Sequence, residues 1–338
     1  MYSFKNDYAQ GAHPNILQKL VETNMEQQAG YADDIYTQQA VALIQQKINN
    51  AEASIHLVTG GTQANLLVIS ALLRTHEAVI SAATGHIYAN EAGAIESTGH
   101  KVIPVETKDG KLSVAAVADC LAQYGLKPHV VKPKLVYISN STEIGSIYSK
   151  AELTALSEYC RAQGLYLFMD GARLGHALMS PTNDLTMADI AALTDVFYIG
   201  ATKNGALLGE AIVLNNPEVA VDFAYVLKQK GALMAKGRLL GIQFLELFKD
   251  DLYLDLALHA NTMALKIAAA IQAKGYTFLT EPQTNQIFPI LPRAIIDKLA
   301  LEYDFFVWKT IDAEHAAIRL ITSWATPEEE VDGLISKF

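Results

Sequence analysis

Cysteine is scarce in this sequence: its 338 residues include only two, Cys120 and Cys160. Both fall in segments with a helical pattern, and their spacing matches no metal-ligand motif. The fold is therefore not expected to depend on disulfides or on a metal. We expect both cysteines to be reduced thiols in the core of a cytoplasmic protein.

Positive charge is also in short supply, with 26 Lys and Arg residues against 36 Asp and Glu residues and a net charge of −10. An acidic chain without clustered Lys and Arg is not expected to bind nucleic acid through its phosphate backbone. No apolar stretch approaches the roughly 18 residues of a membrane span, so no membrane partner is expected. The first residues resemble neither a signal peptide nor a transit peptide.

Apolar residues, by contrast, make up 51% of the chain, which allows a large core to form. From about residue 38, helical patterns alternate with short apolar runs such as residues 165–168 and 211–214. This alternation predicts an α/β fold with parallel strand pairing. The runs themselves do not alternate with polar residues, which is typical of strands buried on both faces.

Two helices are expected at particular places. Residues 88–99 read as one helix that ends at Gly99, and the last helix is expected to have Thr326 as its cap and Pro327 as its first residue. After about residue 245 a long helical stretch and two strand-like runs replace the earlier rhythm, which predicts a separate α+β domain.

Polar residues follow several of the expected strands, at the edge where ligands bind in open α/β sheets. Gly61 and Thr62 begin a helix whose free N–H groups can hold an anion, although an ordinary glycine turn capped by Thr62 is the alternative. His86 follows the next strand. A lone histidine is more often a cap or a core residue, but its ring can also stack on an aromatic cofactor or transfer protons near neutral pH.

An acid and a lysine follow two later strands. Asp170 ends a buried apolar run and needs a partner, which is either Arg173 or a cationic ring nitrogen of a ligand. Lys203 lies in a tight turn of small residues. It either keeps a surface loop hydrated or, at the dry end of a sheet, has a lowered pKa and reacts as a nucleophile.

Together, these residues bring an anion-binding glycine loop, a stacking histidine, a ring-nitrogen aspartate and a nucleophilic lysine to the ends of strands in one sheet. Each feature alone is weak. Their combination predicts that Lys203 holds pyridoxal 5'-phosphate as a Schiff base.

Longer motifs are distributed along nearly the whole chain. They include TGGTQANL at 59–66, HIYANEAGA at 86–94, MDGARLGHAL at 169–178, GATKNGALLGEA at 200–211 and KGRLLGIQF at 236–244. With these motifs the chain resembles the threonine aldolase and β-eliminating lyase family of fold-type I pyridoxal-phosphate enzymes. The resemblance implies a three-layer α/β fold with a mainly parallel central sheet and a smaller C-terminal α+β domain.

The expected division has three parts. Residues 1–36 would form an N-terminal arm near the active site and the interface, residues 37–245 a large pyridoxal-phosphate-binding domain, and residues 246–338 a small C-terminal domain.

The resemblance also implies a role for each cofactor-binding residue. Lys203 would carry the cofactor, and Asp170 would bind its pyridine nitrogen. Arg173 would lie near the phenolic oxygen of the ring, and His86 would stack over the ring in a position to relay protons. The phosphate would be held by Gly61, Thr62 and Thr202.

Other residues would serve the substrate and a neighbouring subunit. Arg238 and Lys230 would reach the phosphate of a partner, so that a homodimer or homotetramer shares its active sites. Arg319 would grip the substrate carboxylate; the alternative is a buried ion pair with a nearby acid. Asn6 and Arg173 would also contact the substrate.

The implied reaction is the aldol cleavage of a β-hydroxy-α-amino acid, such as L-threonine or L-allo-threonine, to glycine and an aldehyde. Two departures concern the side-chain pocket. Asn6-Asp7 replaces a Ser-Asp pair, and Thr142 and Glu143 occupy the segment where many relatives have a histidine. A β-eliminating lyase and a phenylserine-type aldolase are therefore alternatives. A non-catalytic pyridoxal-phosphate sensor is disfavoured, because no DNA-binding module is visible.

Overall fold

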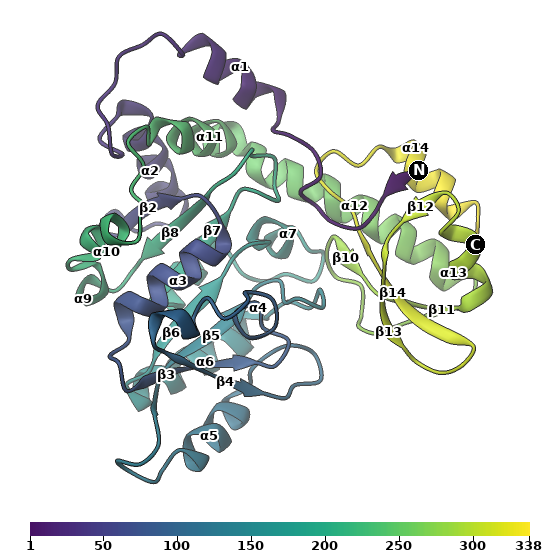
Figure 1. Cartoon of the computed structure of the whole chain (residues 1–338). Helices are drawn as coiled ribbons and strands as arrows, with labels where there is room; N and C mark the ends of the chain where they lie inside the picture. Colours follow the sequence, from purple (N-terminus) through teal and green to yellow (C-terminus); the bar gives the residue numbers. More distant parts are fainter.

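A seven-stranded sheet forms the centre of the larger of two lobes (Figure 1). The computed structural model describes all residues of the chain, 1–338. In spatial order, the strands of this sheet are β2 (Ser54–Val58), β8 (Glu210–Leu214), β7 (Val196–Gly200), β6 (Tyr166–Asp170), β5 (Lys132–Ser139), β3 (Glu77–Ala82) and β4 (Lys101–Val105). Only β8 runs against the others, so the predicted mainly parallel sheet is confirmed.

The reversal of β8 follows from the length of its connection. Only residues 201–209 separate β7 from β8, whereas a parallel crossover needs about a dozen residues or more. β8 therefore pairs antiparallel with β7 on one side and with β2 on the other. The strand-helix rhythm of the sequence does not reveal this exception to parallel pairing.

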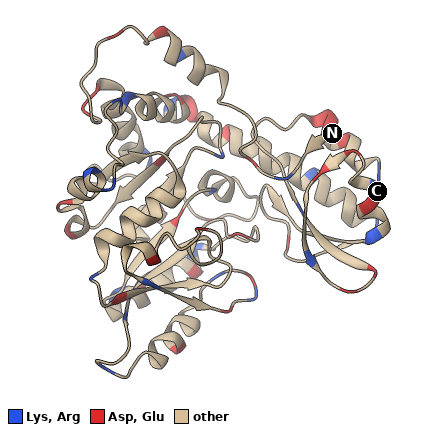
Figure 2. Ribbon diagram, viewed as in Figure 1, with Lys and Arg blue, Asp and Glu red and all other residues tan.

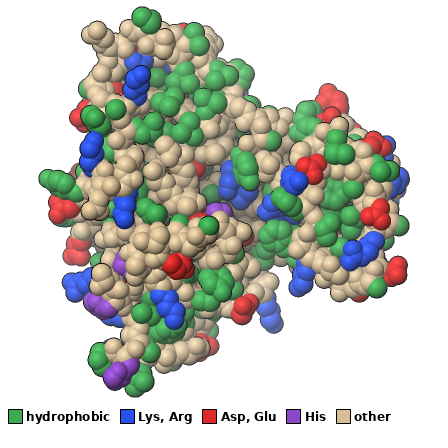
Figure 3. Space-filling model, in the orientation of Figure 1, with side chains coloured by type: hydrophobic (Ala, Val, Ile, Leu, Met, Phe, Trp, Pro, Cys, Tyr) green, Lys and Arg blue, Asp and Glu red, His purple; other side chains and the backbone are tan.

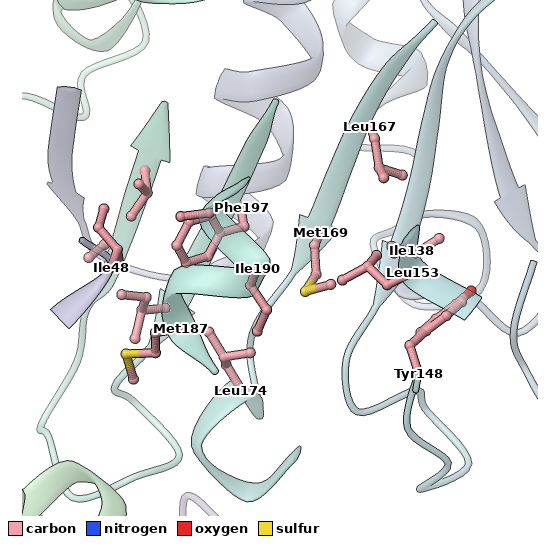
Figure 4. Packing of buried hydrophobic residues seen from close by; sticks show 14 of the residues in the cluster. Ile48, Ile138, Tyr148, Leu153, Leu167, Met169, Leu174, Met187, Ile190 and Phe197 are labelled. Carbon is pink, nitrogen blue, oxygen red and sulfur yellow. The ribbon is translucent and has the colours of Figure 1, made fainter. Parts of the chain in front are cut away.

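Helices cover both faces of the sheet. They are α2 (Ile35–Lys47), α3 (Gly61–Leu72), α4 (His86–Ala89), α5 (Val114–Gln123), α6 (Lys150–Gln163), α7 (Leu174–Leu178), α8 (Met187–Leu193), α9 (Pro217–Ala220), α10 (Phe223–Gln229) and α11 (Arg238–Phe248). Along β5, Val136 and Ile138 face the core beneath α5, α6 and α8. Figure 4 shows Ile138 in this core near Leu153 of α6. Leu135 and Tyr137 face the opposite core, beneath α3 and α10. Burial on both faces explains the continuous apolar runs.

The smaller lobe has its own antiparallel sheet. Its elements are α12 (Leu252–Ala273), β9 (Thr277–Phe278), β10 (Gln286–Ile287), β11 (Pro289–Pro292), α13 (Arg293–Leu299), β12 (Tyr303–Asp304), β13 (Phe306–Thr310), β14 (His315–Ile321) and α14 (Glu328–Ile335). β14 lies between β10 and β11 and also pairs with β13, and a separate core lies between this sheet and the helices. α12 runs from the larger lobe into the smaller one (Figure 1).

The N-terminal segment spans both lobes. β1 (Tyr2–Ser3) pairs in parallel with β12, and Phe4 is buried in the core of the smaller lobe. The chain then crosses to the larger lobe, where α1 (Pro14–Glu22) packs on α11. Residues 5–13 therefore pass between the lobes.

Two local predictions are wrong. Residues 88–99 do not form one helix: α4 ends at Ala89, Ala92 and Gly93 adopt φ values of 49° and 75°, and only a short 3-10 turn follows at Glu96–Thr98. At the last helix, Pro327 is the N-cap and no side chain caps it. The Thr326 hydroxyl instead accepts a hydrogen bond from the Ser323 N–H at 2.8 Å.

One helical stretch is longer and more apolar than the sequence analysis expected. Arg238–Ala273, which contains α11 and α12, meets the length and composition of a membrane span, with a mean hydropathy of 1.2. Half of that apolar window is buried inside the protein, and left-handed backbone at Asp250 interrupts the stretch. α12 packs on α7 and α14, so its apolar side chains belong to the protein core.

Charged residues of both signs are spread over the two lobes (Figure 2). The two cysteines, in contrast, are buried and unpaired, as predicted for core residues. Burial raises the pKa of Cys160 to about 12, so this thiol is not a reactive nucleophile.

Candidate active site

The predicted ligand-binding residues of the large lobe surround one cavity of about 310 Å³, which we call the inner cavity. It lies where β2, β5, β6 and β7 end. The predicted residues in its lining are Gly61, Thr62, His86, Asp170, Arg173, Thr202 and Lys203. Figure 3 shows that the molecule is hollowed between the lobes and that cationic side chains and a histidine gather there.

A second space, the outer cavity, adjoins the inner one and has a volume of about 450 Å³. Asn6 and Arg319 line it, together with the aromatic side chains Phe306 and Trp308. The residues that line both cavities are Tyr8, His86, Glu143, Arg173 and Lys203. The two cavities therefore meet at Lys203.

Lys203 lies at this junction without a fixed partner. Its side chain is half-buried, and its Nζ makes neither a hydrogen bond nor an ion pair. Burial, reinforced by the charge of Arg173, lowers the pKa of Lys203 despite nearby carboxylates. A lowered pKa raises the fraction of neutral amine, which is the nucleophilic form.

Asp170 is buried and held in place by several donors. Its Oδ2 accepts hydrogen bonds from the Tyr137 hydroxyl at 2.5 Å and from Asn65 at 3.2 Å, and its Oδ1 accepts one from the Ala172 N–H at 2.9 Å. Burial opposes ionisation of Asp170, but the nearby His86 and these hydrogen bonds outweigh it and lower the pKa. Asp170 is thus a fixed negative charge that faces the cavity.

The possible pairing of Asp170 with Arg173 is not found. Arg173 instead binds Asp7 through two hydrogen bonds, of 2.7 Å and 3.0 Å. Asp7 is fully buried and also accepts a hydrogen bond from Asn285 at 2.9 Å. Burial opposes the charge on Asp7, but Arg173 and Lys203 hold its pKa well below the ordinary value.

His86 is oriented by residues that the sequence analysis missed. Its Nδ1 lies 2.8 Å from Oε1 of Glu91, whose side chain is completely buried. Asn65 donates to the same oxygen at 2.7 Å and also to Asp170, so one amide links the two acids. Burial opposes protonation of His86, but Glu91 and Asp170 outweigh it and raise the pKa of the ring.

The glycine loop forms the start of α3. Gly60 is the N-cap and its position offers no side-chain cap, so the predicted alternative of a Thr62 cap is wrong. A Cβ on Gly61 would lie 2.9 Å from the Tyr198 hydroxyl, which explains the need for glycine there. The uncapped N–H groups border the inner cavity and can receive an anion.

Thr202 is tied to an acid at the same end of the cavity. Its Oγ1 lies 2.9 Å from Oε1 of Glu210 and accepts the Gly209 N–H at 3.0 Å. Glu210 is buried, and its other carboxyl oxygen has no partner. Burial raises the pKa of Glu210 to about 8, although Thr202 and Lys203 oppose this.

Arg319 has no acidic partner, so the alternative of a buried ion pair is wrong. Its only hydrogen bond runs to the Lys5 carbonyl at 3.4 Å, and its buried Nε has none. The guanidinium lies about 5.0 Å from the ring centre of Phe306 and 5.1 Å from that of Trp308. Asn6 lies nearby, and its amide oxygen accepts the Tyr8 N–H at 3.0 Å.

Arg238 and Lys230 do not line either cavity of their own chain. Arg238 donates to the carbonyl oxygens of Thr23 and Glu26, and Lys230 is exposed after α10. Neither residue therefore lies at the inner cavity of its own chain.

Glu143 faces both cavities with one carboxylate oxygen anchored. Oε1 accepts hydrogen bonds from the Ser139 hydroxyl at 2.7 Å and from the His86 N–H at 2.9 Å. Burial, together with the charge of Asp170, raises the pKa of Glu143. The sequence draws attention to this position only because Thr142 and Glu143 stand where many relatives have a histidine, and it gives no sign of these contacts.

Comparisons with known proteins identify the family of the chain. The family described as beta-eliminating lyase matches residues 4–293. A low specificity L-threonine aldolase from Pseudomonas aeruginosa is 33% identical over 97% of this chain and 94% of that protein. The chain belongs to the beta-eliminating lyase family.

Comparison with solved structures identifies the fold of the chain. A threonine aldolase from Leishmania major has 47% identity and a TM-score of 0.98, covering 99% of this chain and 98% of that one. An aspartate aminotransferase from Thermus thermophilus, at 15% identity, matches with a TM-score of 0.74 over all of this chain and 91% of its own. The predicted fold-type I architecture is thereby confirmed, and the chain is a lyase-family enzyme.

Proposed function

We propose that this enzyme uses pyridoxal 5'-phosphate on Lys203 to cleave a β-hydroxy-α-amino acid of the L-threonine or L-allo-threonine type into glycine and an aldehyde. The observation that carries the proposal is the position of Lys203. Its amine has no partner and a lowered pKa, and it lies where an anion-binding cavity meets a cavity with an unpaired arginine. The threonine aldolases among its relatives support the choice of substrate.

The residues of the inner cavity fit this cofactor. An ionised carboxylate, Asp170, matches a protonated pyridine nitrogen, and His86 borders the cavity as a flat partner for the ring. The N-terminus of α3 and the hydroxyl of Thr202 suit a phosphate. When bound, pyridoxal phosphate supplies an electron sink for the charge left on the substrate α-carbon.

Arg319 would orient the amino acid by its carboxylate. The unpaired Nε of this arginine requires an anionic partner, and a carboxylate can accept two parallel hydrogen bonds from a guanidinium. Fixing the carboxylate also fixes which bond of the α-carbon stands perpendicular to the cofactor ring, and that bond is the one that breaks.

Glu143 is the base that we assign to the substrate hydroxyl. Three acids line the two cavities, and of these Asp170 and Glu210 border only the inner cavity. Glu143 borders both cavities and has a free Oε2, and its raised pKa makes it a better base at neutral pH. It would take the hydroxyl proton as the Cα–Cβ bond breaks.

A phenylserine-type substrate is a second candidate. Phe306 and Trp308 line the outer cavity beside Arg319, and aromatic rings there can pack on an aromatic β-substituent. A β-eliminating lyase is the remaining alternative from within the family. It would release ammonia and a keto acid instead of glycine.

Product analysis separates these reactions. The purified enzyme is incubated with L-threonine, L-allo-threonine or L-phenylserine, and products are quantified by proton NMR. Equal amounts of glycine and aldehyde are expected, and the rates rank the three substrates. Keto acid and ammonia as the main products would overturn the aldolase assignment in favour of the lyase alternative.

We also propose that the active enzyme is a homodimer or homotetramer with shared sites. Arg238 and Lys230 lie outside their own cavities, and α1 and the residues after it expose Leu17, Val21 and Met25 to solvent. Such apolar exposure is typical of an interface. Light scattering is expected to give a mass of two or four chains; a fully active monomer would contradict this.

A further inference from the structure

A buried acid lies at the end of the inner cavity that is suited to an anion. Glu210 begins β8 and pairs across the sheet with Val58 on one side and Gly200 on the other. It therefore lies between the strand that leads into the glycine loop and the strand that leads to Lys203. It is 4% exposed, and its Oε2 is buried without a hydrogen bond. A carboxylate at this place would repel a phosphate.

An ionised Glu210 also competes with a phosphate for the hydroxyl proton of Thr202. A hydroxyl has one proton to donate and two lone pairs that accept. Oγ1 of Thr202 already accepts the Gly209 N–H, and with an ionised Glu210 its only proton points to the carboxylate at 2.9 Å. Thr202 then has no proton left for a phosphate.

A single proton resolves this conflict. If Glu210 is protonated, it donates to the second lone pair of Thr202, and the hydroxyl proton of Thr202 becomes free to turn toward the cavity. The like charge disappears at the same time.

We propose that this end of the cavity takes up one proton, on Glu210, when it receives a phosphate monoester, and that the Thr202 hydroxyl then donates its hydrogen bond to the phosphate instead of to Glu210. The inference rests on the proposed cofactor, whose phosphate is the monoester. It adds that cofactor affinity depends on the protonation of an acid which does not touch the reacting atoms.

The surroundings of Glu210 favour the protonated form. Burial raises its pKa, and the negative charge of Asp170 acts in the same direction. Lys203 opposes this as the cation that faces it, and the other titratable neighbours are Tyr198 and Tyr253, whose own pKa values are raised and which remain neutral.

The test uses the full-length chain freed of cofactor and 4'-deoxypyridoxine 5'-phosphate as the probe. This compound keeps the ring and the phosphate but lacks the aldehyde, so it does not react with Lys203. Calorimetric titration in two buffers of different ionisation enthalpy, near the pKa of Glu210 and above it, gives the number of protons taken up. The phosphate-free 4'-deoxypyridoxine is titrated in parallel, since it reports proton uptake by the ring alone.

Above the pKa of Glu210, wild-type protein is expected to take up about one more proton with the phosphorylated probe than with the phosphate-free one. Near that pKa the difference should be about half as large, because about half of the Glu210 side chains already carry the proton. Its affinity for the phosphorylated probe should fall about tenfold per pH unit above the pKa of Glu210. Glu210→Gln, which is neutral and can donate to Thr202, should lose both effects and bind at least as tightly at high pH. Thr202→Val should bind weakly at every pH.

The outcomes separate the two proposals. Equal proton uptake by both probes, or an unchanged pH dependence in Glu210→Gln, would overturn the role of Glu210 and leave the cofactor assignment intact. No binding of the phosphorylated probe to wild-type protein at any pH would overturn both. Should Glu210→Gln fail to fold, the two-probe proton count is repeated in Lys203→Ala, which lacks the other group of this cavity that could take up the proton. Loss of the extra proton uptake in Lys203→Ala would then overturn the role of Glu210.

Discussion

The inner and outer cavities differ in how their principal charged side chains, Asp170 and Arg319, are held by the protein. In the inner cavity, Asp170, Asn65, Glu91 and His86 form one continuous network. In the outer cavity, Arg319 has a buried Nε without a partner, and its only hydrogen bond is long. Asp170 is therefore held in place by donors of the protein itself, whereas Arg319 has no anionic partner until a ligand supplies one.

This difference matches the different requirements of binding a cofactor and binding a substrate. A cofactor that stays bound through many turnovers is served by a rigid, preorganised site. A substrate that must enter and leave is served by groups that are incomplete without it, because only the correct ligand satisfies them. Changes in the outer cavity should therefore affect turnover and leave cofactor binding intact, whereas changes around Lys203 and the inner network should alter the cofactor or the groups that hold it.

Lys203→Ala is expected to have the largest effect. Without the amine, the cofactor has no covalent link, and turnover should fall by on the order of 10⁴-fold or more. The measurement is the rate of glycine formation under saturating substrate and cofactor. Turnover equal to wild type would contradict the nucleophilic role.

Glu143→Gln should lower kcat by about 10²–10³-fold, which is typical of a lost general base. The pKa of Glu143 is raised, and the base must be ionised, so wild-type kcat should rise with pH through that pKa. This acid limb should vanish in Glu143→Gln and persist in Glu143→Asp. Cofactor content should match wild type in both variants; an unaltered pH profile would remove Glu143 from the mechanism.

Arg319→Ala should mainly weaken substrate binding. Loss of a charged hydrogen-bond pair costs about 1.5–3 kcal/mol, or roughly 10- to 100-fold in KM. Arg319→Lys is the matched control, since it keeps the charge and loses the planar fork. Equal KM values for wild type and Arg319→Ala would assign the substrate carboxylate to another residue.

Glu91→Gln should produce the smallest change, a shift in a titration. Burial opposes protonation of His86, but Glu91 raises its pKa, so removal of that charge should lower the pKa. In NMR titrations of the histidine ring, His86 should lose its proton at a lower pH than in wild type. A titration at the same pH would show that Glu91 does not control the ring.

The sequence predicted the inner cavity well because its residues follow a topological rule. Asp170 ends β6, Lys203 follows β7 and Gly61 follows β2, and strands that point the same way deliver their carboxyl ends to one edge. His86 follows β3 for the same reason. Residues fixed by strand direction can be placed without coordinates.

Other parts of the site depend on distant contacts that no local pattern reveals. Asp7 meets Arg173 across 166 positions of the chain, and the N-terminal segment reaches it only by crossing between lobes. Glu91 was expected to lie within a helix over residues 88–99. In the structure, left-handed backbone at Ala92 and Gly93 ends the helical conformation directly after Glu91. Glu210 reads as the polar start of a strand, and its burial follows from the reversal of β8.

The most direct test of the whole account is to trap the cofactor on the protein. Enzyme loaded with pyridoxal phosphate is reduced with borohydride, digested and mapped by mass spectrometry. The account predicts a phosphopyridoxyl group on the peptide that contains Lys203 and on no other, and none in Lys203→Ala. A label at another lysine, or no label on the loaded wild-type enzyme, would contradict it.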